Sequence, residues 1–208
     1  MSFSKNGYQV VRNVFSKDLL YHLKTEFEMI RDVRFFETNV KNKFAFGDTF
    51  VPKSYCQYGA LPFETLSIQL KEQISQIVDK ELYPTYTYAR VYYKGAILPS
   101  HVDRPSCEYS TTICIDSTDL WDFHIEDRDG KNNTIKLNPG DMCVYDGCNL
   151  SHWREPFQGE MQTQVFLHYV NANGPNSSYK YDKRIMMGIH PPKKSEPNVL
   201  QKSEFTYK

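Results

Sequence analysis

The chain has 208 residues, with 40% hydrophobic and 24% charged side chains, which suits one domain of ordinary size. Its 25 Lys and Arg residues balance 25 Asp and Glu residues, so the formal net charge is zero. No overall electrostatic field exists to attract a nucleic acid, and we expect none as a partner. No apolar run approaches the roughly 18 residues of a membrane span, and the N-terminus lacks the apolar region of a secretory signal. We therefore expect a cytoplasmic protein without membrane contact.

The first half of the chain predicts one strand and two helices. Residues 7–14 are typical of a short strand. After Ser16, apolar residues recur at helical spacing at Leu19, Leu20, Leu23, Phe27 and Ile30. A second helix begins near Pro62, with an apolar stripe at Leu66, Leu70, Ile74 and Ile77. Residues 32–61, between the helices, predict irregular strand and loop rich in aromatic side chains.

The second half predicts an antiparallel double sheet. Residues 85–93 are aromatic and β-branched, and further short strands are expected at 109–115, 121–126, 134–137, 141–146 and 162–170. Turn residues such as Asp129-Gly130 and Pro139-Gly140-Asp141 separate these strands. Short strands without intervening helices favour a sandwich or barrel. We expect one mainly β (α+β) domain over residues 1–190. Its double sheet would have about eight strands in all, and the two N-terminal helices would pack on one of its sheets. The polar tail, 191–208, is expected to be disordered.

The five cysteines are odd in number and form no CxxC pair. This pattern does not complete a zinc site and predicts reduced thiols, most of them packed in the core.

A candidate metal site begins with His101-Val102-Asp103. Residues i and i+2 of an extended segment face the same side, so this imidazole and this carboxylate reach one point together. His152 follows a turn and a strand, 51 residues later, and in a double-stranded β-helix such strands lie side by side. Two His and one carboxylate on one face of a metal form the facial triad of non-haem Fe(II) oxygenases. The alternative for a bare HxD pattern is a solvated loop.

In these features the sequence resembles the 2-oxoglutarate- and Fe(II)-dependent oxygenases, in particular their prolyl-hydroxylase-like branch. The resembling residues are Arg90-Val91-Tyr92, Gly95, His101-Val102-Asp103-Arg104, Cys107-Glu108-Tyr109-Ser110, Pro139-Gly140-Asp141 and the stretch from His152 to Tyr169. The resemblance implies a double-stranded β-helix (jelly roll), with Fe(II) bound by His101, Asp103 and His152. It also implies 2-oxoglutarate as cosubstrate and O2 as oxidant. The expected reaction is hydroxylation of an aliphatic C–H with release of succinate and CO2. The substrate would be a prolyl or other residue of a peptide, or a free small molecule.

The family usually anchors the distal carboxylate of 2-oxoglutarate with Arg or Lys, about nine to eleven residues after the distal His, because a buried charge needs a partner. This window holds Met161, Gln162 and Thr163 and contains no basic residue. We expect Arg154 and Tyr92 to replace the usual anchor, with Gln162 assisting. The alternative for Arg154 is a surface ion pair with Glu155 or Glu160.

Arg90 is a candidate for binding a carboxylate of the substrate, and its alternative is a salt bridge on the strand face. His168 is expected to be buried and hydrogen-bonded within its strand, and His22 to be exposed on the first helix. Two other functions remain open: a cupin-like metal protein that does not use 2-oxoglutarate, and a non-catalytic jelly-roll binding module. A metal-dependent hydrolase is less favoured because no HExxH-like base is present. The oligomeric state is open.

Overall fold

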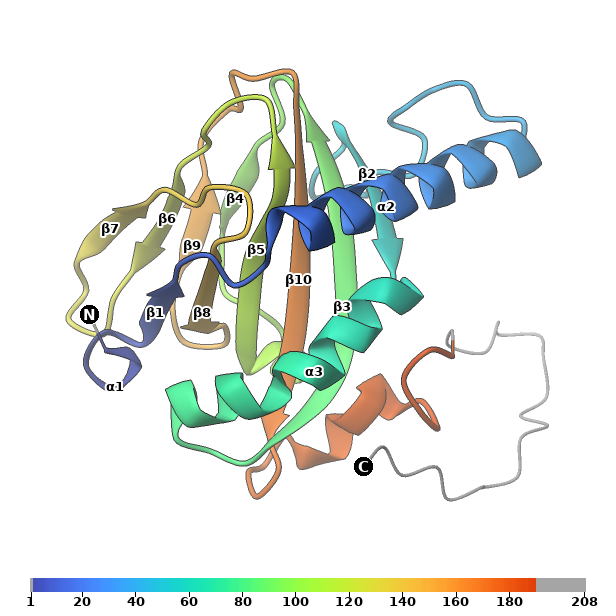
Figure 1. Cartoon of the computed structure of the whole chain (residues 1–208). Coiled ribbons are helices and arrows are strands. Elements are labelled where there is room, and N and C mark those ends of the chain that lie inside the picture. The colour runs from blue at the N-terminus through green and yellow to red at the C-terminus, as the bar shows by residue number, and fades with distance from the viewer. Residues whose placement is uncertain (1, 190–208) are drawn as a thin grey trace.

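The structure is a computed structural model that describes residues 2–189. Within that range the chain forms two antiparallel sheets and three helices (Figure 1). The helices are α1 (Phe3–Asn6), α2 (Lys17–Glu37) and α3 (Leu61–Val78). The larger sheet has the order β1 (Tyr8–Val11), β8 (Met142–Asp146), β5 (Tyr109–Ser117), β10 (Met161–Asn171), β3 (Leu82–Tyr93) and β2 (Ser54–Tyr58). The smaller has the order β4 (Leu98–His101), β9 (His152–Arg154), β6 (Phe123–Glu126) and β7 (Asn132–Ile135). Two 3-10 segments complete the chain, η1 (Pro105–Cys107) and η2 (Ser177–Lys183).

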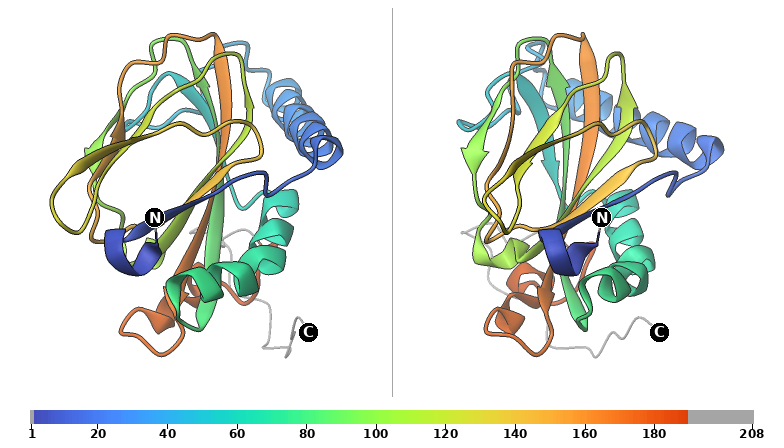
Figure 2. Two further views of the ribbon diagram at one scale, coloured as in Figure 1. Left: turned by 60° about the vertical axis from the view of Figure 1, so that its left-hand side comes forward. Right: turned by 90° about the vertical axis from the view of Figure 1, so that its left-hand side faces the viewer.

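The two sheets face each other, and α2 and α3 cover the outer face of the larger one (Figure 2). Strand β10 shows how the sequence creates both faces. Val165 and Leu167 pack in the core beneath the helices, whereas Phe166 and His168 line the cavity between the sheets. This period-2 alternation is what a strand with one apolar outer face and one functional inner face requires.

The two long helices form where the apolar spacing predicts them. The Ser16 hydroxyl accepts a hydrogen bond from the Leu19 amide at 3.2 Å and caps α2, whose Leu23 and Phe27 are buried. Pro62 lies in the first turn of α3, and Leu66 and Ile74 are buried on its inner face. The expectation of two helices packed on one sheet is confirmed.

The strand count was underestimated, because the described residues contain ten strands instead of about eight. The additional elements are β2, in the segment expected to be irregular strand and loop, β4 with four residues and β9 with three. Strands β4 and β9 are defined by their pairing with each other, which the local sequence does not report. The predicted tail, 191–208, lies outside the described residues.

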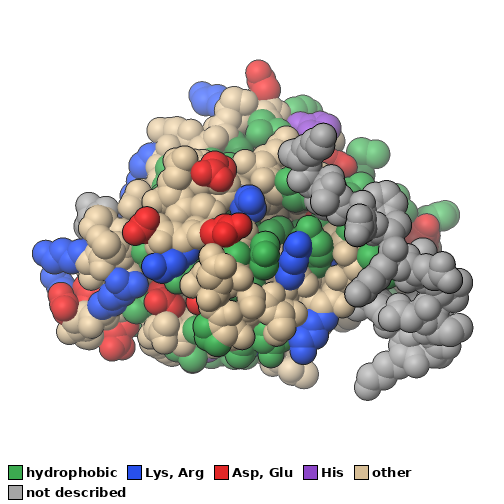
Figure 3. Space-filling view, turned by 90° about the horizontal axis from the view of Figure 1, so that it is seen from below, with side chains coloured by type: hydrophobic (Ala, Val, Ile, Leu, Met, Phe, Trp, Pro, Cys, Tyr) green, Lys and Arg blue, Asp and Glu red, His purple; other side chains and the backbone are tan. Residues whose placement is uncertain are grey.

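All five cysteines are free thiols, and Cys107, Cys114 and Cys143 are buried, as predicted. Among the described residues, no helix combines the length and apolarity that crossing a membrane requires. Seen from below, basic and acidic side chains are interspersed on the visible face, consistent with the zero net charge (Figure 3).

Candidate active site

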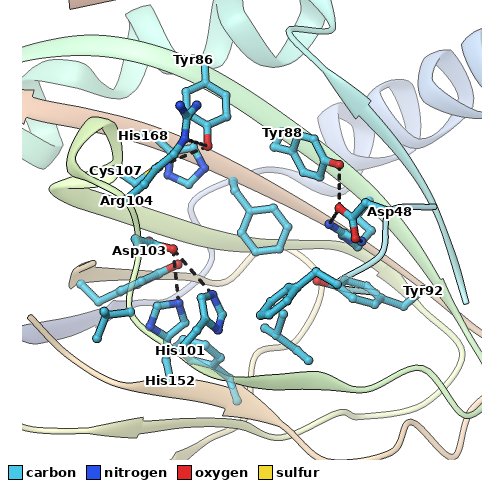
Figure 4. Close-up of a pocket in the computed structure, with 17 residues that line it drawn as sticks. Asp48, Tyr86, Tyr88, Tyr92, His101, Asp103, Arg104, Cys107, His152 and His168 are labelled. Atoms are coloured by element: carbon cyan, nitrogen blue, oxygen red, sulfur yellow. Dashed lines mark hydrogen bonds and ion pairs between the residues drawn. The ribbon is translucent and has the colours of Figure 1, made fainter. Parts of the chain in front are cut away.

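The structure brings His101, Asp103 and His152 together between the sheets (Figure 4). His101 ends β4 and lies opposite His152 on the antiparallel neighbour β9, while Asp103 follows two residues later. The Nε2 atoms of both histidines lie 3.7 Å from Asp103 Oδ1. All three ligand atoms lie within 4.8 Å of one another, a spacing that a single cation can bridge.

Both imidazoles are oriented by backbone carbonyls. His101 Nδ1 lies 2.8 Å from the Pro99 carbonyl oxygen, and His152 Nδ1 lies 2.9 Å from that of Leu150. A carbonyl oxygen only accepts, so each Nδ1 carries the proton and donates it. Each Nε2 is therefore left with a lone pair directed toward Asp103, the tautomer that metal-binding histidines adopt.

Burial shifts the pKa values of the three side chains, and these shifts bear on how the site can bind a cation. It lowers the pKa of His152 to about 4 and, together with the neighbouring His152, lowers the pKa of His101. Both rings are therefore neutral at pH 7 and free to coordinate. Burial also raises the pKa of Asp103 to about 6, against the opposing hydrogen bond from Ser110. A cation bound here would supply the neighbouring positive charge that stabilises the ionised form of this buried carboxylate.

Asp103 is fixed by the turn after β8. Its amide donates to the Gly147 carbonyl at 2.8 Å, and its Oδ2 accepts from the Ser110 hydroxyl at 2.7 Å. A Cβ at Gly147 would stand 2.5 Å from Asp103 Oδ2 and 2.9 Å from Ser110 Oγ. Only glycine lets this turn approach the carboxylate so closely.

The triad opens into a cavity of about 590 Å³, a volume in the range of small-molecule sites. Its walls are mostly aromatic, and they include Phe50, Tyr86, Tyr88, Tyr92, Phe123, Tyr145 and Phe166. Polar groups enter at only a few places, among them Arg90, Arg104, Cys107 and His168 (Figure 4). The cavity therefore combines an apolar body with a small number of directed polar groups.

Arg154 points inward beside this cavity and has no carboxylate partner among residues 2–189. Its side chain is almost fully buried, with a residue exposure of 1%. Nη1 donates to the Trp121 carbonyl oxygen at 2.6 Å, whereas Nη2 is buried without a hydrogen-bond partner. The guanidinium also lies over the rings of Trp121 and Phe123, at 4.9 and 5.2 Å. The alternative of a surface ion pair is wrong, because the residue is interior and Glu160 pairs with Lys94 instead.

A second unpaired donor was not anticipated from the sequence. Gln164 is fully buried, its Oε1 accepts from the Thr112 hydroxyl at 3.1 Å, and its Nε2 has no partner in the described chain. Gln164 lies on β10, opposite Cys114 of β5. Because a buried donor without an acceptor is costly, Arg154 Nη2 and Gln164 Nε2 are both candidates for donating to a bound ligand.

Tyr92 and Gln162 lie side by side, because they are paired residues of β3 and β10. Both are 1% exposed, and Tyr92 lines the cavity. Gln162 Oε1 accepts from the Ser117 hydroxyl at 2.9 Å, which leaves its amide NH2 as the group available for a ligand.

Arg90 lines the cavity but is held by Asp48 of the segment between α2 and β2. Arg90 Nη2 donates to Asp48 Oδ2 at 2.6 Å and Nη1 donates to Oδ1 at 3.3 Å. Ser54 and Tyr88 complete the cluster, since Ser54 accepts from Arg90 and Tyr88 donates to Asp48. The salt-bridge alternative is thus present, although its carboxylate comes from a loop instead of the strand.

His168 is 6% exposed, and its Nδ1 lies 2.9 Å from the Ser110 hydroxyl, so its predicted burial and hydrogen bonding are confirmed. The predicted exposure of His22 is also confirmed, since its side chain is 71% exposed on α2.

Several solved structures resemble this fold over most of the chain. A prolyl-4-hydroxylase of Pseudomonas putida superposes with a TM-score of 0.60 at 15% identity, over 81% of this chain and 95% of its own. HygX of Streptomyces hygroscopicus, solved with nickel, 2-oxoglutarate and hygromycin B, gives 0.63 at 13% identity, over 82% and 85%. SnoK, a non-haem α-ketoglutarate-dependent carbocyclase of nogalamycin biosynthesis, gives 0.67 at 9% identity, over 82% and 81%.

The chain has the fold of the 2-oxoglutarate- and Fe(II)-dependent oxygenases. At such low identities the likeness is one of fold, and no protein-family model and no curated protein matches the sequence. Its function has to be inferred from its own side chains. The window from Met161 to Thr163 begins β10 and contains no basic residue, and the only guanidinium buried without a carboxylate among the described residues is that of Arg154.

Proposed function

We propose that this protein is an Fe(II)- and 2-oxoglutarate-dependent oxygenase with a double-stranded β-helix core, which hydroxylates an aliphatic C–H of its substrate. The observation that carries the proposal is the combination, in one interior, of the His101–Asp103–His152 triad and the unpaired guanidinium of Arg154. Burying either group without a partner is costly. A bound cation would offset the cost at the triad, and a bound anion would offset it at the guanidinium.

The triad fits Fe(II) by the chemistry of its donors. Two neutral imidazoles and one carboxylate are the donor set of a facial triad, and the three side chains adjoin the cavity. Iron bound there with 2-oxoglutarate would supply the oxidation of a C–H by O2, with succinate and CO2 as the other products. His101 and His152 would hold the metal through Nε2, and Ser110 keeps the Asp103 carboxylate oriented.

We pair Arg154 with the distal carboxylate of 2-oxoglutarate because its charge is buried and its Nη2 has no acceptor among the described residues. Gln164 Nε2 is a second buried donor without an acceptor. Tyr92 and the amide NH2 of Gln162 assist from the adjoining strands. The surrounding Trp121 and Phe123 rings exclude water, which strengthens a charge-assisted hydrogen bond.

The substrate that we propose is a prolyl or other residue of a peptide, or a free small molecule that fits the aromatic cavity. The similar structures span this range, since one is a prolyl-4-hydroxylase and another holds hygromycin B. Arg90 binds an acidic group of the substrate only if Asp48 gives up its present contact. A cupin-like protein that does not use 2-oxoglutarate would leave Arg154 Nη2 without this partner.

Anaerobic titration tests the proposal. The Fe(II)-loaded protein is titrated with 2-oxoglutarate while the visible charge-transfer band of the chelate is recorded. We expect a saturable band, which is absent in His152→Ala because that variant lacks a ligand. Iron bound without any band would exclude 2-oxoglutarate as the cosubstrate and favour the cupin-like alternative. A band without succinate formation in air, over a screen of peptides and small molecules, would favour a non-catalytic module.

A further inference from the structure

A second group of side chains that could ligate a metal shares Asp103 with the triad. It consists of Asp103, Cys107 and His168, each of which offers a ligand atom within 4.8 Å of the other two, and Cys107 and His168 have no part in the proposed reaction. Cys107 and His168 are buried, with exposures of 2% and 6%. The ligand atoms of a tetrahedral zinc site lie about 3.3–3.8 Å apart, so side-chain shifts on the order of 1 Å close this cluster around an ion.

The three side chains come from separate elements that the fold ties together. Cys107 ends the 3-10 helix η1, which is joined to β3 by the hydrogen bond from the Thr85 hydroxyl to the Ser106 carbonyl at 2.7 Å. The Ser110 hydroxyl contacts the Cys107 carbonyl at 3.1 Å and His168 Nδ1 at 2.9 Å. The ligands are therefore held close together before any ion binds.

Asp103 belongs to both groups through its two oxygens. Oδ1 is the atom 3.7 Å from His101 and His152, whereas Oδ2 lies on the side of Ser110, whose hydroxyl also contacts His168. A carboxylate placed in this way can bridge two cations. The Tyr86 hydroxyl lies 3.2 Å from Cys107 Sγ, the sulfur that would bind the ion.

The two groups prefer different metals. Imidazole and carboxylate suit Fe(II), whereas a thiolate selects thiophilic ions such as Zn(II). We infer that Asp103, Cys107 and His168 form a second divalent-cation site for a thiophilic metal, which shares Asp103 with the His101–His152 site. On binding, the Cys107 thiol releases its proton to solvent and a sulfur–metal bond forms, with no change of oxidation state.

Cobalt(II) is a suitable probe because a thiolate ligand gives it a near-ultraviolet charge-transfer band. The metal-free protein is titrated with Co(II), and bound metal is measured by equilibrium dialysis. We expect the wild type to bind a second equivalent and to develop the thiolate band. Cys107→Ser should lose both. Cys148→Ser is the matched control, since this thiol is also near Asp103 yet donates to the Arg104 carbonyl, and it should retain both.

The double variant His101→Ala/His152→Ala separates this inference from the proposed function. It removes the first site and leaves Cys107 and His168 intact, so the thiolate band should persist. A single bound equivalent without the band in the wild type overturns the inference, as does a band that survives in Cys107→Ser. Failure of the 2-oxoglutarate titration leaves the cobalt result unaffected, because no part of this test needs the cosubstrate.

A consequence that does depend on the proposed function concerns zinc. Because a metal at Cys107 and His168 draws on Asp103, zinc should inhibit succinate formation at a concentration that Cys107→Ser tolerates. Equal inhibition of both proteins would mean that zinc acts only by replacing iron at His101 and His152, and that zinc at the second site does not inhibit succinate formation.

Discussion

At the scale of single residues, Arg154 is the most informative side chain, because it is a buried charge whose Nη2 has no hydrogen-bond partner in the described chain. Removing a guanidinium from water costs several kcal/mol unless a partner restores its hydrogen bonds. In the described structure only the Trp121 carbonyl and two aromatic rings do so. A residue that destabilises the unliganded protein and faces its interior is typical of a ligand-binding residue.

Replacement of Arg154 by Met should therefore separate binding from stability. One charge-assisted hydrogen bond contributes about 1.5–3 kcal/mol, so the Kd for 2-oxoglutarate should rise about tenfold to a hundredfold. The free energy of unfolding without ligand should fall by no more than about 1 kcal/mol, or rise, since a buried unpaired charge is removed. Anaerobic titration and urea unfolding measure the two quantities.

Gln164→Leu is the companion variant, and it should weaken 2-oxoglutarate binding less than Arg154→Met, because its amide is neutral. If Arg154→Met unfolds easily and still binds 2-oxoglutarate like the wild type, the arginine is a structural residue and the assigned anchor is wrong.

Residue chemistry explains which parts of the site the sequence could predict. The i, i+2 spacing of His101 and Asp103, and the inward direction of Arg154 from His152, follow from strand geometry alone. Gln164 could not be identified, because a glutamine on an inward-facing strand position is unremarkable until its Nε2 is known to lack a partner. Asp48 could not be identified either, since its contact with Arg90 spans 42 residues.

At the scale of elements, the turn after β8 positions the metal ligand Asp103. Gly147→Ala should push Asp103 and Ser110 away, because the new Cβ would stand 2.5 and 2.9 Å from their side-chain oxygens. Changes to groups that orient a metal ligand typically cost about 10–100-fold in metal affinity, and we expect a loss of that size in Co(II) or Fe(II) titrations. An unchanged affinity would show that the turn moves freely and does not position the carboxylate.

Gly130→Ala is the control for this substitution. Gly130 has a φ of +75° in the β6–β7 hairpin, and the nearest atom to a new Cβ is 3.7 Å away. Its replacement should cost about 1–2 kcal/mol of stability through left-handed strain and leave metal affinity unchanged.

The turn before β8 depends on Asp141, a carboxylate with 2% exposure. It accepts from Arg12 Nη1 at 2.7 Å, from the Asn13 amide at 3.0 Å and from the Asn138 amide at 2.9 Å. Burial alone would raise the pKa of Asp141, but these three donors outweigh it and hold the pKa below its ordinary value. The carboxylate thus joins the N-terminal chain to the larger sheet.

Asp141→Asn should accordingly destabilise the protein at neutral pH by about 1.5–3 kcal/mol, toward the lower end because Arg12 is half-exposed. A lowered carboxyl pKa gives stability that is present above the unfolded value of about 3.9 and is lost as the pH falls through the folded value. The difference between wild type and variant in urea unfolding should therefore be constant from about pH 5 to 8 and close below about pH 4. Asp129→Asn, an exposed turn residue, should show no such difference at any pH.

Elements with a long period were predictable and short ones were not. The apolar stripes of α2 and α3 extend over several turns, so their existence followed from the sequence. Strand β9 has three residues and is defined by its neighbours β4 and β6, which lie far from it in sequence. A strand of this kind depends on tertiary pairing, which local propensity does not report.

At the scale of the whole molecule, the C-terminal segment closes the end of the sheets beneath α3 (Figure 1). Arg184 Nη2 donates to Glu64 Oε1 of α3 at 2.7 Å and to the Thr85 carbonyl of β3 at 3.0 Å. Both side chains are nearly inaccessible, at 2% and 1% exposure. Two residues before Arg184, the Asp182 carboxylate accepts from Arg104, which lines the cavity, and from Tyr58. The fold thus joins the C-terminal segment to the border of the active site across 78 residues and to Glu64 of α3 across 120, which no local pattern in the sequence reveals.

A double-mutant cycle on Glu64 and Arg184 tests this closure. Glu64→Leu or Arg184→Met alone leaves the partner charge buried and unpaired, so each should lower the free energy of unfolding by about 3–5 kcal/mol. The double variant removes both charges and should lose clearly less than the sum, because the remaining cost is that of lost backbone contacts with Thr85 and Gly188. Urea unfolding measures the cycle, and limited proteolysis within residues 177–189 should accelerate in the single variants. Additive losses would mean that the pair does not act as a unit and that the C-terminal segment is held by its other contacts.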